Sequence, residues 1–168
     1  MTDIDSKRVG YARQKARAVL QEFFAKNPSE RLPIPVKEIA EFYGFEIYEL
    51  KTLNKHQRAI KHDIQSENRR LIGVNASYHR HNQRFSMGHE LGHHFLEHPA
   101  EEDCDDEQIK IFNREADEFS AELLIPLDLL KEKLTELRDA SAVAKLFDVS
   151  EQALWIKISS QRLLSLLS

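Results

Sequence analysis

Hydrophobic residues recur at three- and four-residue steps over much of the chain, which is the period of an amphipathic α-helix. The first such stretch covers about residues 8–26 and has a basic outer face. A shorter one at residues 36–43 is followed by Gly44, and glycine is the residue that most often closes a helix in the left-handed conformation. Both stretches are predicted to be helices.

Apolar and polar residues alternate after Gly44, which is typical of half-buried β-strands. Residues 45–50 alternate in this way, residues 59–64 do so more weakly, and residues 71–75 are apolar and β-branched. The segment between the last two, residues 65–68, suits a hairpin loop. We therefore expect a small antiparallel sheet, and an edge strand of such a sheet could receive a substrate segment by strand addition.

The second half of the chain returns to the helical period. Helices are predicted over residues 78–99 and 108–125, and each is bounded at its C-terminal end by a proline. Three shorter stretches with the same period follow, at residues 127–137, 140–147 and 151–164. Several helices beside one small sheet predict an α+β fold, with a domain at residues 1–126 and a helical C-terminal segment at residues 127–168 packed on it.

Residues 142–154 have the cadence of a helix-turn-helix, with Ser150 placed to cap the second helix. Such a motif can read DNA, but the same geometry can also serve only to pack a small subdomain. The would-be recognition helix offers Lys157 and Arg162 as its cations, which is few for phosphate contacts. Packing is the favoured interpretation, and direct nucleic-acid binding is not expected.

Composition places the chain among ordinary globular proteins. Its 168 residues are 41% hydrophobic and 31% charged, with a net charge of −4, which argues against a general nucleic-acid binder. The amino terminus has no apolar signal core and no run approaches 18 apolar residues, so we expect a cytoplasmic protein with no membrane partner. The single cysteine, Cys104, excludes an internal disulfide, and the acidic run at residues 101–107 around it suits a solvated loop.

The predicted helix at residues 78–99 contains a His-Glu-x-x-His motif, formed by His89, Glu90 and His93. Residues four apart on a helix have Cβ atoms about 5–6 Å apart, so the two imidazoles can converge on one zinc ion. Glu90 is rotated by roughly 100° from His89 around the helix axis, where it can act as general base for a water that zinc acidifies. The pattern can also arise by chance, but the apolar positions around it suit a buried helix.

Four further histidines lie near this motif in the sequence. Surface or structural roles are expected for His79, His81, His94 and His98. Tyr78 or His79 could donate a hydrogen bond to the oxyanion of a tetrahedral intermediate, although no spacing selects either residue.

Two long motifs resemble the ImmA/IrrE-type zinc metallopeptidases: Arg-Phe-Ser-Met-Gly-His-Glu-Leu-Gly-His at 84–93 and Glu-Ala-Asp-Glu-Phe-Ser-Ala-Glu-Leu-Leu-Ile-Pro at 115–126. Shorter matches lie at residues 32–40, 44–47, 72–75 and 146–154, so the resemblance extends over nearly the whole chain. It implies a zincin-like fold and an endopeptidase that cleaves a partner protein, typically a helix-turn-helix transcriptional repressor. By this resemblance His89 and His93 match zinc ligands, Glu90 matches the catalytic base, and Asp117 matches a carboxylate that orients a ligating imidazole.

The resemblance fails at the third zinc ligand. The family has a glutamate four residues before Asp117, whereas this chain has Asn113, whose neutral amide oxygen is a much poorer zinc donor than a carboxylate. Glu115 is the nearest upstream carboxylate and is the candidate third ligand, although it lies about 200° around a helix from the Asn113 face. It could ligate only if the helix begins late or shifts register. Weak zinc binding, a ligand from elsewhere and a degenerate enzyme all remain open.

Three hypotheses from different classes follow. The first is a zinc endopeptidase that cleaves a repressor, with His89 and His93 as ligands and Glu90 as base. The second is a protein of the same fold that controls a repressor by binding alone, and Asn113 motivates it. The third and least favoured is a sequence-specific DNA binder that uses residues 140–164.

Overall fold

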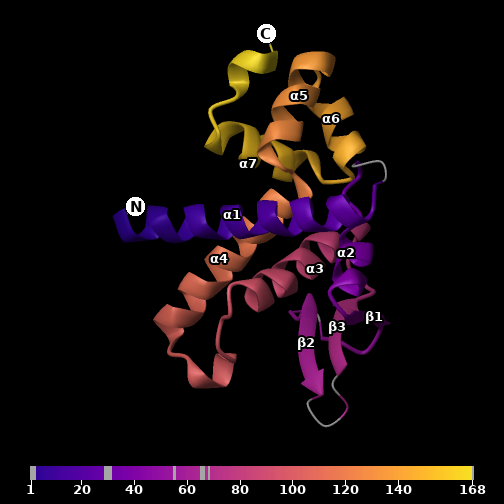
Figure 1. Ribbon diagram of the computed structural model, residues 1–168, viewed down its shortest axis with the longest axis vertical. Coiled ribbons are helices and arrows are strands. Elements are labelled where there is room, and N and C mark those ends of the chain that lie inside the picture. The colour runs from indigo at the N-terminus through magenta and orange to yellow at the C-terminus, as the bar shows by residue number, and fades with distance from the viewer. Residues whose placement is uncertain (1–2, 29–31, 55, 65–66, 68, 168) are drawn as a thin grey trace.

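The computed structural model describes residues 3–28, 32–54, 56–64, 67 and 69–167. Within these residues, seven α-helices lie beside one three-stranded sheet (Figure 1), which confirms the predicted α+β class. The helices are α1 (Asp3–Lys26), α2 (Val36–Phe42), α3 (Arg80–Phe95), α4 (Asp106–Leu124), α5 (Leu127–Leu137), α6 (Ala140–Phe147) and α7 (Glu151–Ser160). The strands are β1 (Phe45–Leu50), β2 (Ala59–Ile64) and β3 (Arg69–Asn75). In the described part of the chain, no helix combines the length and hydrophobicity that a bilayer span requires.

The sheet is mixed, which corrects the prediction of an antiparallel one. Its strand order is β1-β3-β2, and β2 pairs antiparallel with β3, whereas β1 pairs parallel with β3. The predicted loop at residues 65–68 lies outside the described residues except for Glu67, but the β2–β3 pairing is that of a hairpin. Strand β3 lies between the other two strands, and it runs opposite to β2 and in the same direction as β1.

Two glycines of α3 allow α4 to lie very close to it. A Cβ atom added at Gly88 would lie 2.4 Å from the Ser120 hydroxyl oxygen, and one added at Gly92 would lie 2.9 Å from the Ala116 Cα. The Ser120 hydroxyl also donates a hydrogen bond of 2.8 Å to the Phe85 carbonyl oxygen. These contacts fix the register of α4 on α3, and the register decides which α4 side chains meet the His-Glu-x-x-His motif.

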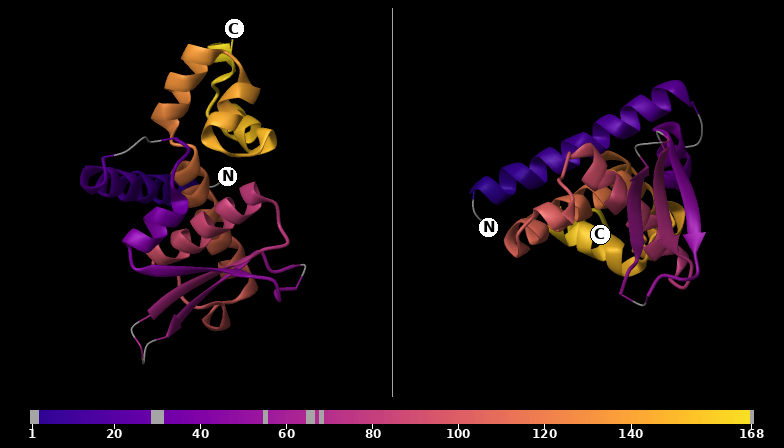
Figure 2. Two further views of the ribbon diagram at one scale, coloured as in Figure 1. Left: turned by 90° about the vertical axis from the view of Figure 1, so that its right-hand side faces the viewer. Right: turned by 90° about the horizontal axis from the view of Figure 1, so that it is seen from below.

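Helix α1 crosses the middle of the molecule, with α5 to α7 on one side of it and α3 and the sheet on the other (Figures 1 and 2). The basic face of α1 was predicted to be an outer face, but three of its arginines pair with glutamates of α4. The pairs are Arg8–Glu115, Arg13–Glu118 at 2.8 Å and Arg17–Glu122 at 2.8 Å. The pairs are spaced about one helical turn apart along both helices, so they hold α1 lengthwise on α4.

The C-terminal helices form a compact group at one end of the molecule (Figure 2). The Ser150 side chain accepts a hydrogen bond from the Ala153 amide, as predicted, and so caps α7. Lys157 of α7 is buried and lies 2.5 Å from the Glu122 carboxylate of α4. One of the two cations of the would-be recognition helix is therefore unavailable to a phosphate, which supports the packing interpretation. The boundary between residues 126 and 127 stays a prediction.

Candidate metal centre

The two motif histidines face each other on α3. Their Nε2 atoms are 3.0 Å apart, because residues four apart lie one above the other on a helix. From α4, the Asn113 side-chain oxygen comes within 3.1 Å of the His93 Nε2 atom. Two imidazole nitrogens and one amide oxygen therefore converge from two helices on one small region.

Asp117 of α4, to which the family resemblance gives the role of orienting a ligating imidazole, lies beside the outer nitrogen of His89. Its Oδ1 atom is 2.8 Å from His89 Nδ1, and a carboxylate can only accept there, so Nδ1 carries the hydrogen. Burial opposes a charge on His89, but the hydrogen bond to Asp117 and the charges of Asp117 and Glu90 outweigh it and raise the pKa of the imidazole. In the neutral ring the lone pair is then on Nε2, the atom directed at His93.

The surroundings of His93 favour the neutral form of its imidazole. Burial, together with the positive charges that His89 and His98 can carry, lowers its pKa to about 4. A metal-binding imidazole must be unprotonated on its ligating nitrogen. At neutral pH His93 meets that requirement without having to release a proton.

Glu90 directly follows His89 on α3. Burial raises the pKa of its carboxyl group, although the nearby charges of His89 and of Lys61 on β2 oppose the shift. A base works best when its pKa approaches the operating pH. The surroundings therefore move Glu90 in the direction that general-base chemistry requires.

The structure does not bring Glu115 to the two imidazoles, contrary to its selection as third-ligand candidate. Helix α4 begins early, at Asp106, because Asp105 and Gln108 form a reciprocal capping box that satisfies the first amides. In this register Asn113 points to the histidine pair, and Glu115 lies on another face. Its carboxylate contacts Arg8 and lies 2.9 Å from His98 Nε2.

His98 is the residue that the sequence reasoning missed, since it was expected to be a surface or structural histidine. Its side chain is only 3% exposed, and its Nδ1 atom lies 2.9 Å from His93 Nδ1. Burial lowers the pKa of His98, although Glu115 opposes the shift. The available signal was its position, five residues after His93 and just before Pro99, where a chain leaving a helix can fold back over the last turn.

The other nearby side chains have structural contacts. His79 caps α3 by accepting the His81 amide hydrogen at 3.3 Å, and His94 Nε2 lies 3.3 Å from an Arg70 nitrogen. The Arg58 guanidinium lies over the Tyr78 ring, 6.0 Å from its centre. None of these contacts tests the idea that Tyr78 or His79 stabilises an oxyanion, which stays a prediction.

The converging donor atoms suit a zinc ion with two strong ligands and one weak ligand. Two nitrogens on one tetrahedral zinc lie about 3.3 Å apart when each bond is about 2.0–2.1 Å long, close to the 3.0 Å between the two Nε2 atoms. Within the described residues no group of three His, Cys, Asp or Glu side chains converges in a way that could hold a metal. The Asn113 oxygen is a donor of another type, and with the two imidazoles it would make three protein ligands, the number that catalytic zinc sites usually have.

Comparison with known proteins identifies the family of this chain. Residues 40–159 match the family described as the IrrE N-terminal-like domain, a family of peptidases. The chain belongs to this family. The IrrE-like resemblance drawn from the two long motifs is thereby confirmed, and the α+β fold with its small sheet is consistent with the family.

A solved structure of a Mycobacterium tuberculosis transcriptional regulator has a similar fold. The TM-score is 0.63 at 13% sequence identity, over 87% of this chain and 47% of that one. The present chain thus spans about half the length of that regulator, and at this identity the likeness concerns the fold alone. A search of curated proteins found no significant match.

Proposed function

We propose that the protein is a cytoplasmic zinc-dependent endopeptidase, with His89, His93 and Asn113 as zinc ligands and Glu90 as general base. The observation that carries this proposal is the convergence of the His89 and His93 Nε2 atoms, 3.0 Å apart, on the buried motif helix of a peptidase-family chain. The Asp117 carboxylate on the outer nitrogen of His89 supports it, because zinc-binding imidazoles usually have such a partner.

Each motif side chain has a role in this mechanism. Zinc, when bound, would acidify a water toward pKa about 7 and polarise the scissile carbonyl. Glu90 accepts the proton of the attacking water and then donates it to the leaving amine. Asp117 keeps the His89 ring oriented throughout. Lys61 on β2, an edge strand of the sheet, is near enough to Glu90 to influence its pKa, so a substrate segment added to this edge would lie close to the base.

The proposed substrate is a partner protein, a DNA-binding repressor of the helix-turn-helix class. The resemblance to ImmA/IrrE peptidases supports this choice of substrate class. The similar fold of a transcriptional regulator is in keeping with a role in transcription. Cleavage of the repressor would relieve its control of the target genes.

Metal content tests the proposal directly. We expect close to one zinc per chain in the purified protein, measured by elemental mass spectrometry, and loss of that zinc in His93→Ala. His94→Ala is the matched control, since the Nε2 atom of His94 faces Arg70 rather than the donor cluster. A wild-type protein that stays zinc-free after zinc is supplied would contradict the proposal.

Asn113 favours a second candidate, a protein of this fold that regulates a repressor by binding without cleavage.

Asn113→Glu tests whether the side chain at position 113 supplies the third zinc donor. A carboxylate is a stronger zinc donor than an amide, so zinc affinity should rise by more than about tenfold, as measured by competition with a chromophoric chelator. Asn113→Gln, which has the same length but no charge, should show no such gain. If Asn113→Glu fails to tighten binding, α4 does not supply the third donor.

A further inference from the structure

The C-terminal end of α3 folds His98 back beneath His93. Glu97 has a left-handed backbone with φ of 56°, and its amide donates to the His94 carbonyl oxygen at 3.1 Å. The amide of His98 donates to the His93 carbonyl oxygen, also at 3.1 Å. These two bonds form a Schellman motif, in which the residue after the left-handed position packs against the residue five before it. Here both of those residues are histidines.

A continuous hydrogen-bonded chain then leads from His93 to Glu115. His93 Nδ1 is 2.9 Å from His98 Nδ1, and His98 Nε2 is 2.9 Å from a Glu115 carboxylate oxygen. Arg8 of α1 pairs with the other oxygen of Glu115, so the carboxylate is held in its charged form. A charged carboxylate accepts from His98 Nε2–H, and in the neutral His98 ring Nδ1 then accepts from His93 Nδ1–H. The remaining lone pair of His93 is on Nε2, beside His89 and Asn113.

We propose that His98 and Glu115 form an outer relay that orients His93 and fixes its tautomer for zinc binding. The relay rests on the zinc site proposed above. It gives each ligand histidine a carboxylate: Asp117 acts on His89 directly, and Glu115 acts on His93 through His98. A carboxylate behind an imidazole increases its basicity as a ligand. A glutamate at position 113 would bring its negative charge directly to the metal. In this chain the negative charge of Glu115 lies behind the ligand His93 instead.

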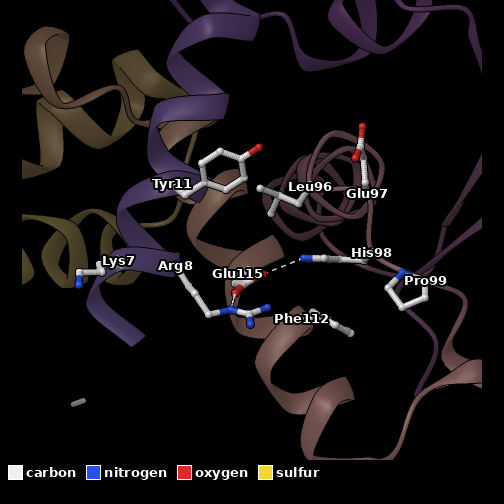
Figure 3. Close-up of a pocket in the computed structure, with 9 residues that line it drawn as sticks. All are labelled: Lys7, Arg8, Tyr11, Leu96, Glu97, His98, Pro99, Phe112 and Glu115. Carbon is white, nitrogen blue, oxygen red and sulfur yellow. Dashed lines mark hydrogen bonds and ion pairs between the residues drawn. The ribbon is translucent and has the colours of Figure 1, made fainter. Parts of the chain in front are cut away.

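The relay borders a cleft of about 360 Å³ between α1 and the C-terminal end of α3. Figure 3 shows Arg8 and His98 approaching Glu115 from opposite sides of this cleft. The His98 ring stacks on Phe112, with ring centres 4.6 Å apart and an interplanar angle of 27°. A phenylalanine at position 98 can keep that stacking while it removes both nitrogens, so His98→Phe breaks the relay with little change in packing.

Zinc affinity of the whole protein, measured by chelator competition, tests the inference. We expect His98→Phe to bind zinc about 10–100-fold more weakly, which is the usual effect of losing a ligand's outer partner. His98→Gln should recover part of the loss, since its amide can accept at one end and donate at the other. The control His94→Phe should bind like the wild type, because His94 Nε2 contacts Arg70 outside the relay.

A spectroscopic readout separates orientation from general packing. In ¹⁵N NMR spectra of the zinc-loaded wild type, His98 should be in the Nε2–H form and accept on Nδ1. His98 protonated on Nδ1, or zinc binding by folded His98→Phe as tight as in the wild type, would overturn the relay alone. A wild type that binds no zinc would overturn the proposed function, and the relay with it. If His98→Phe does not fold, the tautomer of His98 in the wild type decides whether the relay exists.

Discussion

Glu90→Gln is expected to lower the rate of repressor cleavage by about 10²–10⁴-fold, the usual contribution of a general base. The amide has nearly the shape of the carboxylate but cannot accept the proton of the attacking water. Zinc binding should be unchanged, because the converging donor atoms belong to His89, His93 and Asn113. The measurement is single-turnover cleavage of a purified repressor, followed by mass spectrometry, with zinc content determined on the same sample.

The matched control is Glu102→Gln, which makes the same chemical change at an exposed position before α4. It should cleave at the wild-type rate. Cleavage by zinc-loaded Glu90→Gln at an undiminished rate would contradict the assignment of the base. The same variant also tests the binding-only alternative in cells, since relief of repression by Glu90→Gln would mean that contact without cleavage is sufficient.

Those features of the centre that follow from local rules could be predicted from sequence. The four-residue spacing of His89 and His93 and the position of Asp117 depend on helix geometry and the family motif, and the structure brings these three residues together. The start of α4 was also encoded locally, because Asp105 and Gln108 have the spacing of a capping box. That capping box excludes a late start of the helix, which was one of the two conditions under which Glu115 could have been a zinc ligand.

Other features depend on contacts between distant segments, for which one sequence has no local signal. Alternation along a strand shows which residues share a face, but not which strand is its neighbour, so the parallel β1–β3 pairing was not predictable. Likewise, nothing near Arg8 in the sequence indicates a partner at Glu115, 107 residues away. The relay through His98 requires both that pairing and the fold-back after α3, and so became visible only in the structure.

Glu122→Ala is expected to lower the free energy of unfolding by about 3–5 kcal/mol, because it leaves a buried lysine without its counter-ion. Glu122 is 1% exposed, and its two oxygens lie 2.5 Å from Lys157 Nζ of α7 and 2.8 Å from Arg17 Nε of α1. Burial already lowers the pKa of Lys157 against the opposing effect of Glu122. Equilibrium urea unfolding followed by circular dichroism measures the change.

Two further variants serve as comparisons for the stability of Glu122→Ala. Glu118→Ala removes the partly exposed neighbour in the same row of ion pairs and should cost only about 0–1 kcal/mol. The double variant Glu122→Leu with Lys157→Met removes both buried charges and should regain most of the lost stability. A loss in Glu122→Ala no larger than in Glu118→Ala would mean that Lys157 reaches solvent. The expected difference would instead show that α7 is attached through a buried charge to α4, the helix that also carries Asn113 and Asp117.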